Sequence, residues 1–258
     1  RHIPLRESFA CDIRSMPHGA ALIVLLLNYR NISEHSGSRN FNGNGLLPPF
    51  VAGNQRECPF MLYFDHAATT PPYDSVIDAV GEVMGRHFGN PSSIHRLGID
   101  AERLTAKARD VVAGLLRTSA DEIAFTSGGT ESNNLAILGA AREYASRGKH
   151  VITTEIEHAS VYECFRYLER SGFEVTYVKP DRSGIVRADD VLAAVRDDTI
   201  LVSVMHVNNE IGTIQPIGRI GRALRDKRRV LFHVDAVQSV GKLPVYPGEL
   251  GIDLLSAS

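Results

Sequence analysis

From Met61 onward, short β-rich runs alternate with segments of helical periodicity, and this alternation constrains the fold more than any other feature. The β-rich runs are residues 122–126, 151–154, 173–178, 200–207, 230–234 and 252–255, separated mostly by helical patterns at 131–146, 160–170, 188–195 and 217–227. Strands that alternate with helices imply right-handed crossovers and a mainly parallel sheet covered on both faces. The sequence therefore predicts an α/β fold with three layers, α/β/α.

Two further helices are expected ahead of the first of these strands. Apolar residues recur at spacings of three and four over residues 76–88 and again over residues 94–115, which is the helical period. The expected N-caps are Asp74 or Ser75 for the first helix and Ser92 or Ser93 for the second.

Residues 1–60 differ in character from the rest of the chain, because they lack a sustained period and are rich in loop formers. Their longest apolar run, residues 20–27, is too short to span a membrane and is expected to form one or two helical turns. The alternative is the apolar part of a signal peptide that begins at Met16, but the basic leader and small-residue cleavage site are missing. We interpret residues 1–60 as a leader or disordered extension that contributes nothing to the fold.

Charge and cysteine content exclude several classes of function. The chain has 28 Lys and Arg against 30 Asp and Glu, a net charge of −2, so we expect no binding to nucleic acid or to an anionic membrane. Its 3 cysteines are odd in number and lack a CxxC spacing, which indicates neither a disulfide framework nor a zinc site. We expect no metal, and a reducing cytoplasm as the location.

A glycine-rich turn follows the expected strand at residues 122–126. It reads Ser-Gly-Gly-Thr-Glu-Ser over residues 127–132 and leads directly into a helix. Two glycines let backbone N–H groups turn toward a ligand, and the helix N-terminus adds partial positive charge, so the turn suits a phosphate. It is neither a Walker loop nor a GxGxxG motif. The alternative interpretation is a structural turn capped by Thr130.

Three other strand ends carry polar candidates, and ligands of open α/β sheets bind beyond the carboxyl ends of the strands. His158 opens a helix, where it is a catalytic candidate or a cap; Asn208 and Asn209 orient a polar ligand or form a turn. Asp235 directly follows a buried strand, with Gln238 nearby, and acts either as counter-ion to a ring nitrogen or as a structural cap. Pyridoxal phosphate needs this combination of groups at one sheet edge.

The sequence from residue 61 to residue 258 resembles the amino-terminal half of the cysteine desulfurases of the NifS/IscS type, class V of the fold-type I pyridoxal-phosphate enzymes. Six stretches carry the resemblance in family order: residues 63–71 (YFDHAATTP), 89–95 (GNPSSIH), 126–134 (TSGGTESNN), 157–158 (EH), 205–212 (MHVNNEIG) and 233–242 (HVDAVQSVGK). The resemblance implies a pyridoxal-phosphate large domain at residues 76–258, incomplete at its carboxyl end, after an amino-terminal segment at residues 61–75.

The resemblance also assigns roles to seven residues. The phosphate ligands would be Gly129, Thr130 and Ser258, while His158 would stack on the pyridine ring and move protons. The remaining contacts to the ring would be Asn209 and Gln238 at its oxygen and Asp235 at its nitrogen.

The activity implied is that of a cysteine desulfurase, which converts L-cysteine to L-alanine and leaves a persulfide on an enzyme cysteine for a sulfur-acceptor or scaffold protein. A homodimer is expected for the complete enzyme. The nearest enzymatic alternatives are a selenocysteine lyase or another class-V aminotransferase. The alternative of another class is a non-catalytic truncated scaffold or dimerisation module.

Two catalytic groups of the family have no counterpart in this sequence. The lysine that binds the cofactor covalently follows soon after the position of Ser258, and the nucleophilic cysteine lies further on. None of Cys11, Cys58 and Cys164 stands at a matching position, and Cys164 lies on an expected helix as a core residue. We therefore expect this chain to be an inactive fragment.

Overall fold

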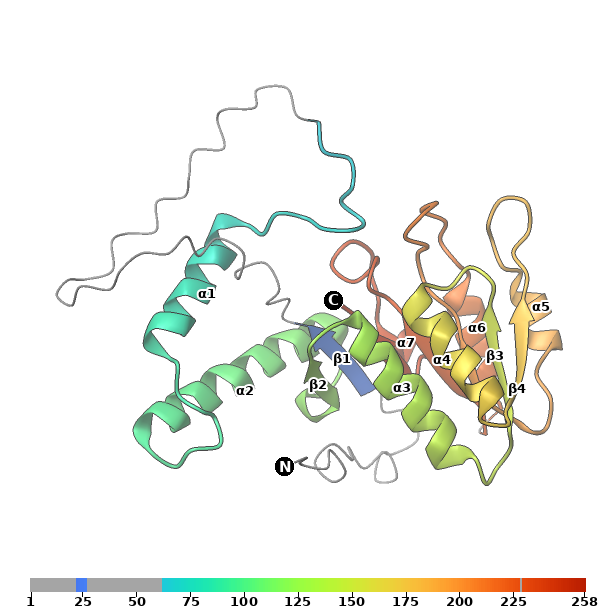
Figure 1. Ribbon diagram of the computed structural model, residues 1–258, viewed down its shortest axis with the longest axis horizontal. Coiled ribbons are helices and arrows are strands. Elements are labelled where there is room, and N and C mark those ends of the chain that lie inside the picture. Colours follow the sequence, from blue (N-terminus) through green and yellow to red (C-terminus); the bar gives the residue numbers. More distant parts are fainter. Residues whose placement is uncertain (1–21, 27–61, 228) are drawn as a thin grey trace.

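The computed structural model describes residues 22–26, 62–227 and 229–258, and its centre is a parallel sheet with helices on both faces (Figure 1). The strands of the described part are β1 (Leu22–Leu26), β2 (Ile123–Thr126), β3 (His150–Thr154), β4 (Glu174–Val178), β5 (Thr199–Ser203), β6 (Leu231–Asp235) and β7 (Leu254–Ser256). They pair in the order β2-β1-β7-β6-β5-β3-β4, and every pair is parallel.

Apart from α1 (Asp74–Arg86), the helices divide between the two faces of this sheet. Those of the described part are α1 (Asp74–Arg86), α2 (Arg96–Leu116), the 3-10 turn η3 (Ala120–Glu122), α3 (Gly129–Tyr144), α4 (Ala159–Arg170), α5 (Ala188–Ala193), α6 (Ile217–Leu224) and α7 (Pro247–Leu250). One apolar cluster joins α3 and α4 to the sheet, and a second joins α5, α6 and the end of α2 to the other face. This three-layer α/β/α arrangement confirms the predicted fold class.

Helices and strands other than β1, η3 and α7 match predicted segments, with differences at their ends. The predicted strand at residues 200–207 ends at Ser203, because Val207 instead forms an antiparallel bridge to Ile214 and closes a loop. The predicted serine and aspartate caps are wrong. Tyr73 precedes α1 without a side-chain cap, and the Nδ1 atom of His95 accepts from the backbone of α2.

Strand β1 contradicts part of the leader prediction. It was expected to lie outside the fold in a helical turn, but it pairs with β2 on one side and with β7 on the other (Figure 1). A continuous apolar run of this length suits a parallel strand, because a central parallel strand is covered on both faces. The rest of residues 1–60 lies outside the described residues, and the division of the chain at residue 60 stays a prediction.

Helix α1 stands apart from the sheet (Figure 1) and contains no buried residue. The apolar positions that predicted it are present but exposed, including Val76, Val83 and Met84. The periodicity therefore identified the helix correctly, although its apolar face contacts no core in the described part of the chain. No described helix combines the length and apolar character that a bilayer span requires.

The central strands are tied together beneath their carboxyl ends. The ring nitrogens of His233 on β6 lie 2.8 Å from Ser203 Oγ on β5 and 3.0 Å from Ser256 Oγ on β7. Complete burial lowers the pKa of His233 to about 3, so the imidazole is neutral and bridges the two hydroxyls. The two contacts of His233 hold β5, β6 and β7 together at a point two residues before Asp235.

A close helix contact gives a first test of this packing. An added Cβ at Gly221 on α6 would lie 2.0 Å from the carbonyl oxygen of Leu250, whereas at Gly114 on α2 nothing lies within 4 Å. We expect Gly221→Ala to lower the free energy of unfolding by about 1–3 kcal/mol through overpacking. Gly114→Ala should raise it by up to about 1 kcal/mol through helix propensity. Equal effects of the two substitutions in urea denaturation would contradict the packing described here.

Hydrogen exchange tests the placement of β1. Because β1 has a strand on each side, its backbone amides should exchange as slowly as those of β2. Exchange at Leu22–Leu26 as fast as in an unstructured peptide would restore the original leader interpretation.

Candidate active site

A cavity of about 440 Å³ lies at the carboxyl ends of five strands. Residues that follow β2, β3, β5, β6 and β7 line it, together with part of the amino-terminal segment. The lining residues are Asp65, Ala67, Ala68, Gly129, Thr130, Asn133, His158, Ser160, Met205, Val207, Asn209, Glu210, Asp235, Val237, Gln238 and Ser258.

All seven candidate site residues from the sequence lie in this one cavity. They are far apart in the chain and come together because parallel strands end at the same edge of the sheet. Their proximity is a property of the structure, whereas the role of each residue toward a ligand stays a prediction.

The turn between β2 and α3 brings a helix N-terminus to the cavity. Gly129 begins the helix and packs so closely that an added Cβ would lie 2.9 Å from the side chain of Val237. The Glu131 carboxylate accepts the backbone N–H of Ser127 at 2.6 Å, and hydrogen bonds from Ser127 lower the pKa of Glu131. The first N–H groups of a helix have no partner within it, so Gly129 and Thr130 offer donors to an anion.

Asp235 is the buried acid of the site, with only 5% of its surface exposed. Its Oδ1 atom accepts the backbone N–H of Val237 at 3.0 Å, and its Oδ2 atom accepts from Asn133 Nδ2 at 2.8 Å. Burial raises the pKa of Asp235, while these hydrogen bonds and the nearby His158 act in the opposite direction. The carboxylate is therefore held in place and can pair with a cationic group in the cavity.

His158 caps the N-terminus of α4, and the Nδ1 atom of its ring faces Ser160. Its Nδ1 atom accepts from the backbone N of Ser160 at 3.1 Å and lies 2.8 Å from Ser160 Oγ. An Nδ1 atom that accepts an N–H carries no proton, so the proton of the neutral ring is on Nε2. The ring thus has a cap role and is also part of the cavity wall.

The loop after β5 carries Asn209, and Asn208 fixes its shape. The Asn208 side chain donates to the Ile156 carbonyl at 2.8 Å and accepts the backbone N–H groups of Glu210 and Ile211 at 2.9 and 3.0 Å. Asn209 itself donates to Glu210 at 2.7 Å and faces the cavity. The turn-forming role considered for the amide pair therefore applies to Asn208.

Gln238 contacts the amino-terminal segment across the cavity. Its Nε2 atom donates to the carbonyl oxygen of Ala67 at 2.9 Å, and its Oε1 atom accepts from Lys242 Nζ at 3.3 Å. The hydrogen bond to Ala67 spans 171 positions of the sequence and holds residues 65–68 against the strand ends.

Glu157 is a buried acid to which sequence reasoning gave no role. Although the residue is partly exposed, its carboxyl group is buried: Oε1 accepts from Thr154 Oγ1 at 2.6 Å and from Met205 N at 2.9 Å. Its Oε2 atom is buried without a hydrogen-bond partner among the described residues. Burial, with a smaller contribution from Asp235, raises the pKa of Glu157 to about 8. Glu157 thus ties the His158 loop to the loop after β5.

Asn133 and Ser160 were also missed, although both line the cavity. Asn133 belongs to the stretch at residues 126–134 and lies on the helix turn after Thr130, facing Asp235. Helical spacing behind the glycine-rich turn at residues 127–132 was the available signal. Cys164 is buried, as predicted, and burial raises the pKa of its thiol to about 11, which disfavours the reactive thiolate. Cys11 and Cys58 lie outside the described residues.

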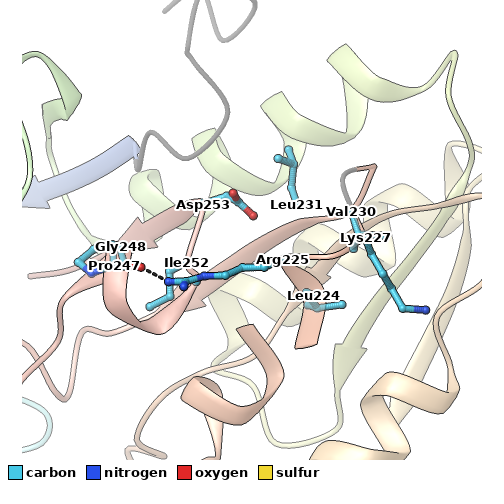
Figure 2. Close-up of a pocket in the computed structure, with 10 residues that line it drawn as sticks. Leu224, Arg225, Lys227, Val230, Leu231, Pro247, Gly248, Ile252 and Asp253 are labelled. Atoms are coloured by element: carbon cyan, nitrogen blue, oxygen red, sulfur yellow. Dashed lines mark hydrogen bonds between the residues drawn. The ribbon is translucent and has the colours of Figure 1, made fainter. Parts of the chain in front are cut away.

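A second cavity, of about 520 Å³, lies at the opposite ends of β6 and β7 (Figure 2). Two of its polar side chains are engaged with backbone, because Arg225 donates to the Gly248 carbonyl and Asp253 accepts from Phe232 N at 2.8 Å. None of the candidate residues lies there. Although this cavity is larger, the strand-end cavity is the better candidate because polar groups from five strand ends converge in it.

The family comparison agrees with the site. Residues 62–258 match the family described as aminotransferase class-V, and the chain belongs to this family.

Curated relatives show which class-V proteins this chain resembles. The chain is 49% identical over 197 residues to a cysteine desulfurase IscS of Dictyoglomus turgidum and 51% identical over 200 residues to that of Vibrio atlanticus. Each alignment covers 76% of this chain and 50% or 49% of the relative, so the chain spans about half the length of these curated relatives.

Solved structures give the same result. A NifS-like protein is 42% identical with a TM-score of 0.75 over 77% of this chain and 55% of its own. SspA in complex with cysteine is 42% identical with a TM-score of 0.71 over 76% of this chain and 56% of its own. The resemblance to the NifS/IscS type is confirmed.

The Glu157 site predicts a pH dependence of stability. A carboxyl whose pKa rises from 4.5 to about 8 on folding stabilises the fold fully below pH 4.5 and loses this contribution as the pH rises toward 8. Glu157→Gln keeps an oxygen acceptor and removes the titration. From pH 5 to pH 8, urea denaturation should show the variant gaining a few kcal/mol relative to the unmodified chain, as an order of magnitude.

The matched control is Glu163→Gln at an exposed position of α4. Its stability profile should run parallel to that of the unmodified chain. A parallel profile for Glu157→Gln as well would show that the Glu157 carboxyl is not buried.

Proposed function

We propose that this chain forms the cofactor-binding part of a pyridoxal-phosphate-dependent cysteine desulfurase, which converts L-cysteine to L-alanine and passes sulfur to an enzyme cysteine. The observation that carries the proposal is a buried carboxylate, Asp235, in the same cavity as the N-terminus of α3. The names of the relatives support the activity. The absence of these two groups from one cavity would have argued against any pyridoxal enzyme.

The residues present fit pyridoxal phosphate. The cavity volume of about 440 Å³ is in the range of small-molecule sites. The phosphate would bind at Gly129, Thr130 and Ser258 through backbone and hydroxyl donors, since the cavity lining of the described chain contains no lysine or arginine. Asp235 would pair with the ring nitrogen.

Three further residues suit the rest of the ring. His158 would stack on its face, and its Nε2 proton is free of the hydrogen bonds that occupy Nδ1. Asn209 and Gln238 would reach the ring oxygen from the loops that follow the neighbouring strands β5 and β6. In this arrangement the contacts to the phosphate come from the ends of β2 and β7, and those to the ring from the ends of β3, β5 and β6.

When bound, the cofactor draws electrons away from the α-carbon of an amino-acid substrate. Asp235 supports this chemistry by holding a proton at the ring nitrogen, which requires an ionised carboxylate next to it. His158 orients the ring and moves protons at its Nε2 atom. The segment at residues 65–68, held by Gln238, forms part of the cavity wall.

The complete protein requires groups that the family resemblance places after Ser258. These are the lysine that binds the cofactor, the cysteine that receives sulfur, and the remainder of the second domain. A homodimer, a sulfur-acceptor protein and a cytoplasmic location are proposed on the same basis, as are the domain limits at residues 61–75 and 76–258.

The test is turnover by the protein that contains this chain. We expect alanine release from L-cysteine, and Asp235→Ala should lower the turnover number by roughly 100- to 1,000-fold, the effect of losing a preorganised electrostatic group. The control is Asp189→Ala, which removes an exposed aspartate paired with Arg219 at 2.6 Å and should leave turnover unchanged.

Two results would contradict the proposal. Normal turnover in Asp235→Ala would show that the acid is misassigned. Release of selenium from selenocysteine with no release of sulfur from L-cysteine, or amino transfer without alanine release, would favour another class-V activity.

A further inference from the structure

A continuous hydrogen-bonded path joins the two sides of the candidate site. Asn133 Nδ2 lies 2.8 Å from Asp235 Oδ2 and 2.9 Å from Ser160 Oγ, and Ser160 Oγ lies 2.8 Å from His158 Nδ1. The four residues come from α3, α4, β6 and the residue that caps α4. Asn133 and Ser160 are buried, with 1% and 9% of their surfaces exposed.

The direction of each hydrogen bond follows from chemistry. An ionised carboxylate only accepts, so the Asn133 amide must turn its NH₂ group toward Asp235. The second hydrogen of that NH₂ group goes to Ser160 Oγ. His158 Nδ1 already accepts the backbone N–H of Ser160, so the Ser160 hydroxyl donates its hydrogen to the same nitrogen.

We propose that Asn133 is a positioning residue that holds the Asp235 carboxylate ionised and aimed into the cavity, and that Ser160 couples this acid to His158. The proposal rests on the proposed function, because it concerns the two residues that would contact the ring. It adds two side chains to which the sequence assigned no role.

The geometry makes Asn133 the only side-chain donor to Asp235 among the hydrogen bonds of the described residues, since the other donor is the backbone of Val237. A charge-assisted hydrogen bond to a buried carboxylate is stronger than a neutral one. The other titratable groups that face Asp235 are Glu157 and His158, both from the loop between β3 and α4. Loss of the Asn133 donor therefore leaves a buried carboxylate with a single partner.

The test measures Asp235 directly and without cofactor. In the 258-residue chain, labelled with ¹³C at aspartate carboxyl carbons, NMR titration should show that Asn133→Ala raises the Asp235 midpoint by about one pH unit, the scale of one charge-assisted hydrogen bond. Asn134→Ala is the matched control, because the next amide on the same helix donates to the Thr130 carbonyl at 2.8 Å. It should leave the midpoint unchanged.

Ser160 provides a second, independent variant. If the Ser160 side chain has only a structural role in α4, Ser160→Ala leaves the Asp235 midpoint unchanged. If the path is coupled, Ser160→Ala raises the midpoint by a smaller amount than Asn133→Ala, and Ser160→Thr, which keeps the hydroxyl, restores it. Far-ultraviolet circular dichroism identifies any variant that fails to fold, and the remaining variants then decide the result.

Pyridoxal phosphate binding is measured separately, by fluorescence titration of the same variants in the protein that contains this chain, because the family resemblance places the cofactor-binding lysine after Ser258. A raised Asp235 midpoint without cofactor binding would sustain this inference and overturn the proposed function. Cofactor binding by a chain in which neither Asn133→Ala nor Ser160→Ala moves the midpoint would sustain the proposed function and overturn this inference.

Discussion

The buried carboxylate of Asp235 is the constraint on which the rest of the site depends. A carboxylate with 5% of its surface exposed is costly unless donors replace the lost water. The donors are Val237, on the loop that leaves β6, and Asn133, on the first turns of α3. Satisfying one acid therefore fixes the distance between a strand end and a helix N-terminus, the two features that a ring nitrogen and a phosphate require.

The parallel sheet explains why these groups meet at all. Every pair of neighbouring strands is parallel, so the loops that follow β2, β3, β5, β6 and β7 all open on the same edge. Beneath that edge, His233 joins the three central strands through two serine hydroxyls. Above it, Glu157 and Asn208 join neighbouring loops. Buried polar contacts thus hold the strands beneath the cavity and two of the loops that line it.

Most of the fold was predictable from local patterns, because strands β2–β7 and helices α1–α6 each carry their own apolar period. The positions of Asp235 and His158 at strand ends were predictable for the same reason. What local patterns do not encode is pairing over long distance. The apolar run at Leu22–Leu26 gives no sign of its neighbours β2 and β7, so its sequence alone does not place it in the sheet. The contact of Asn133 with Asp235 spans 102 positions and is equally invisible in the sequence.

The exposed apolar face of α1 shows a second limit of local sequence patterns, because periodicity identifies a helix but not the residues that cover it. We propose that this edge of the sheet binds pyridoxal phosphate in one orientation, and a crystal structure of the chain with pyridoxal phosphate tests this directly. We expect the phosphate at the N-terminus of α3 and the ring nitrogen hydrogen-bonded to Asp235. A cofactor bound with its ring nitrogen away from Asp235, or bound in the cavity at the opposite ends of β6 and β7, would contradict it.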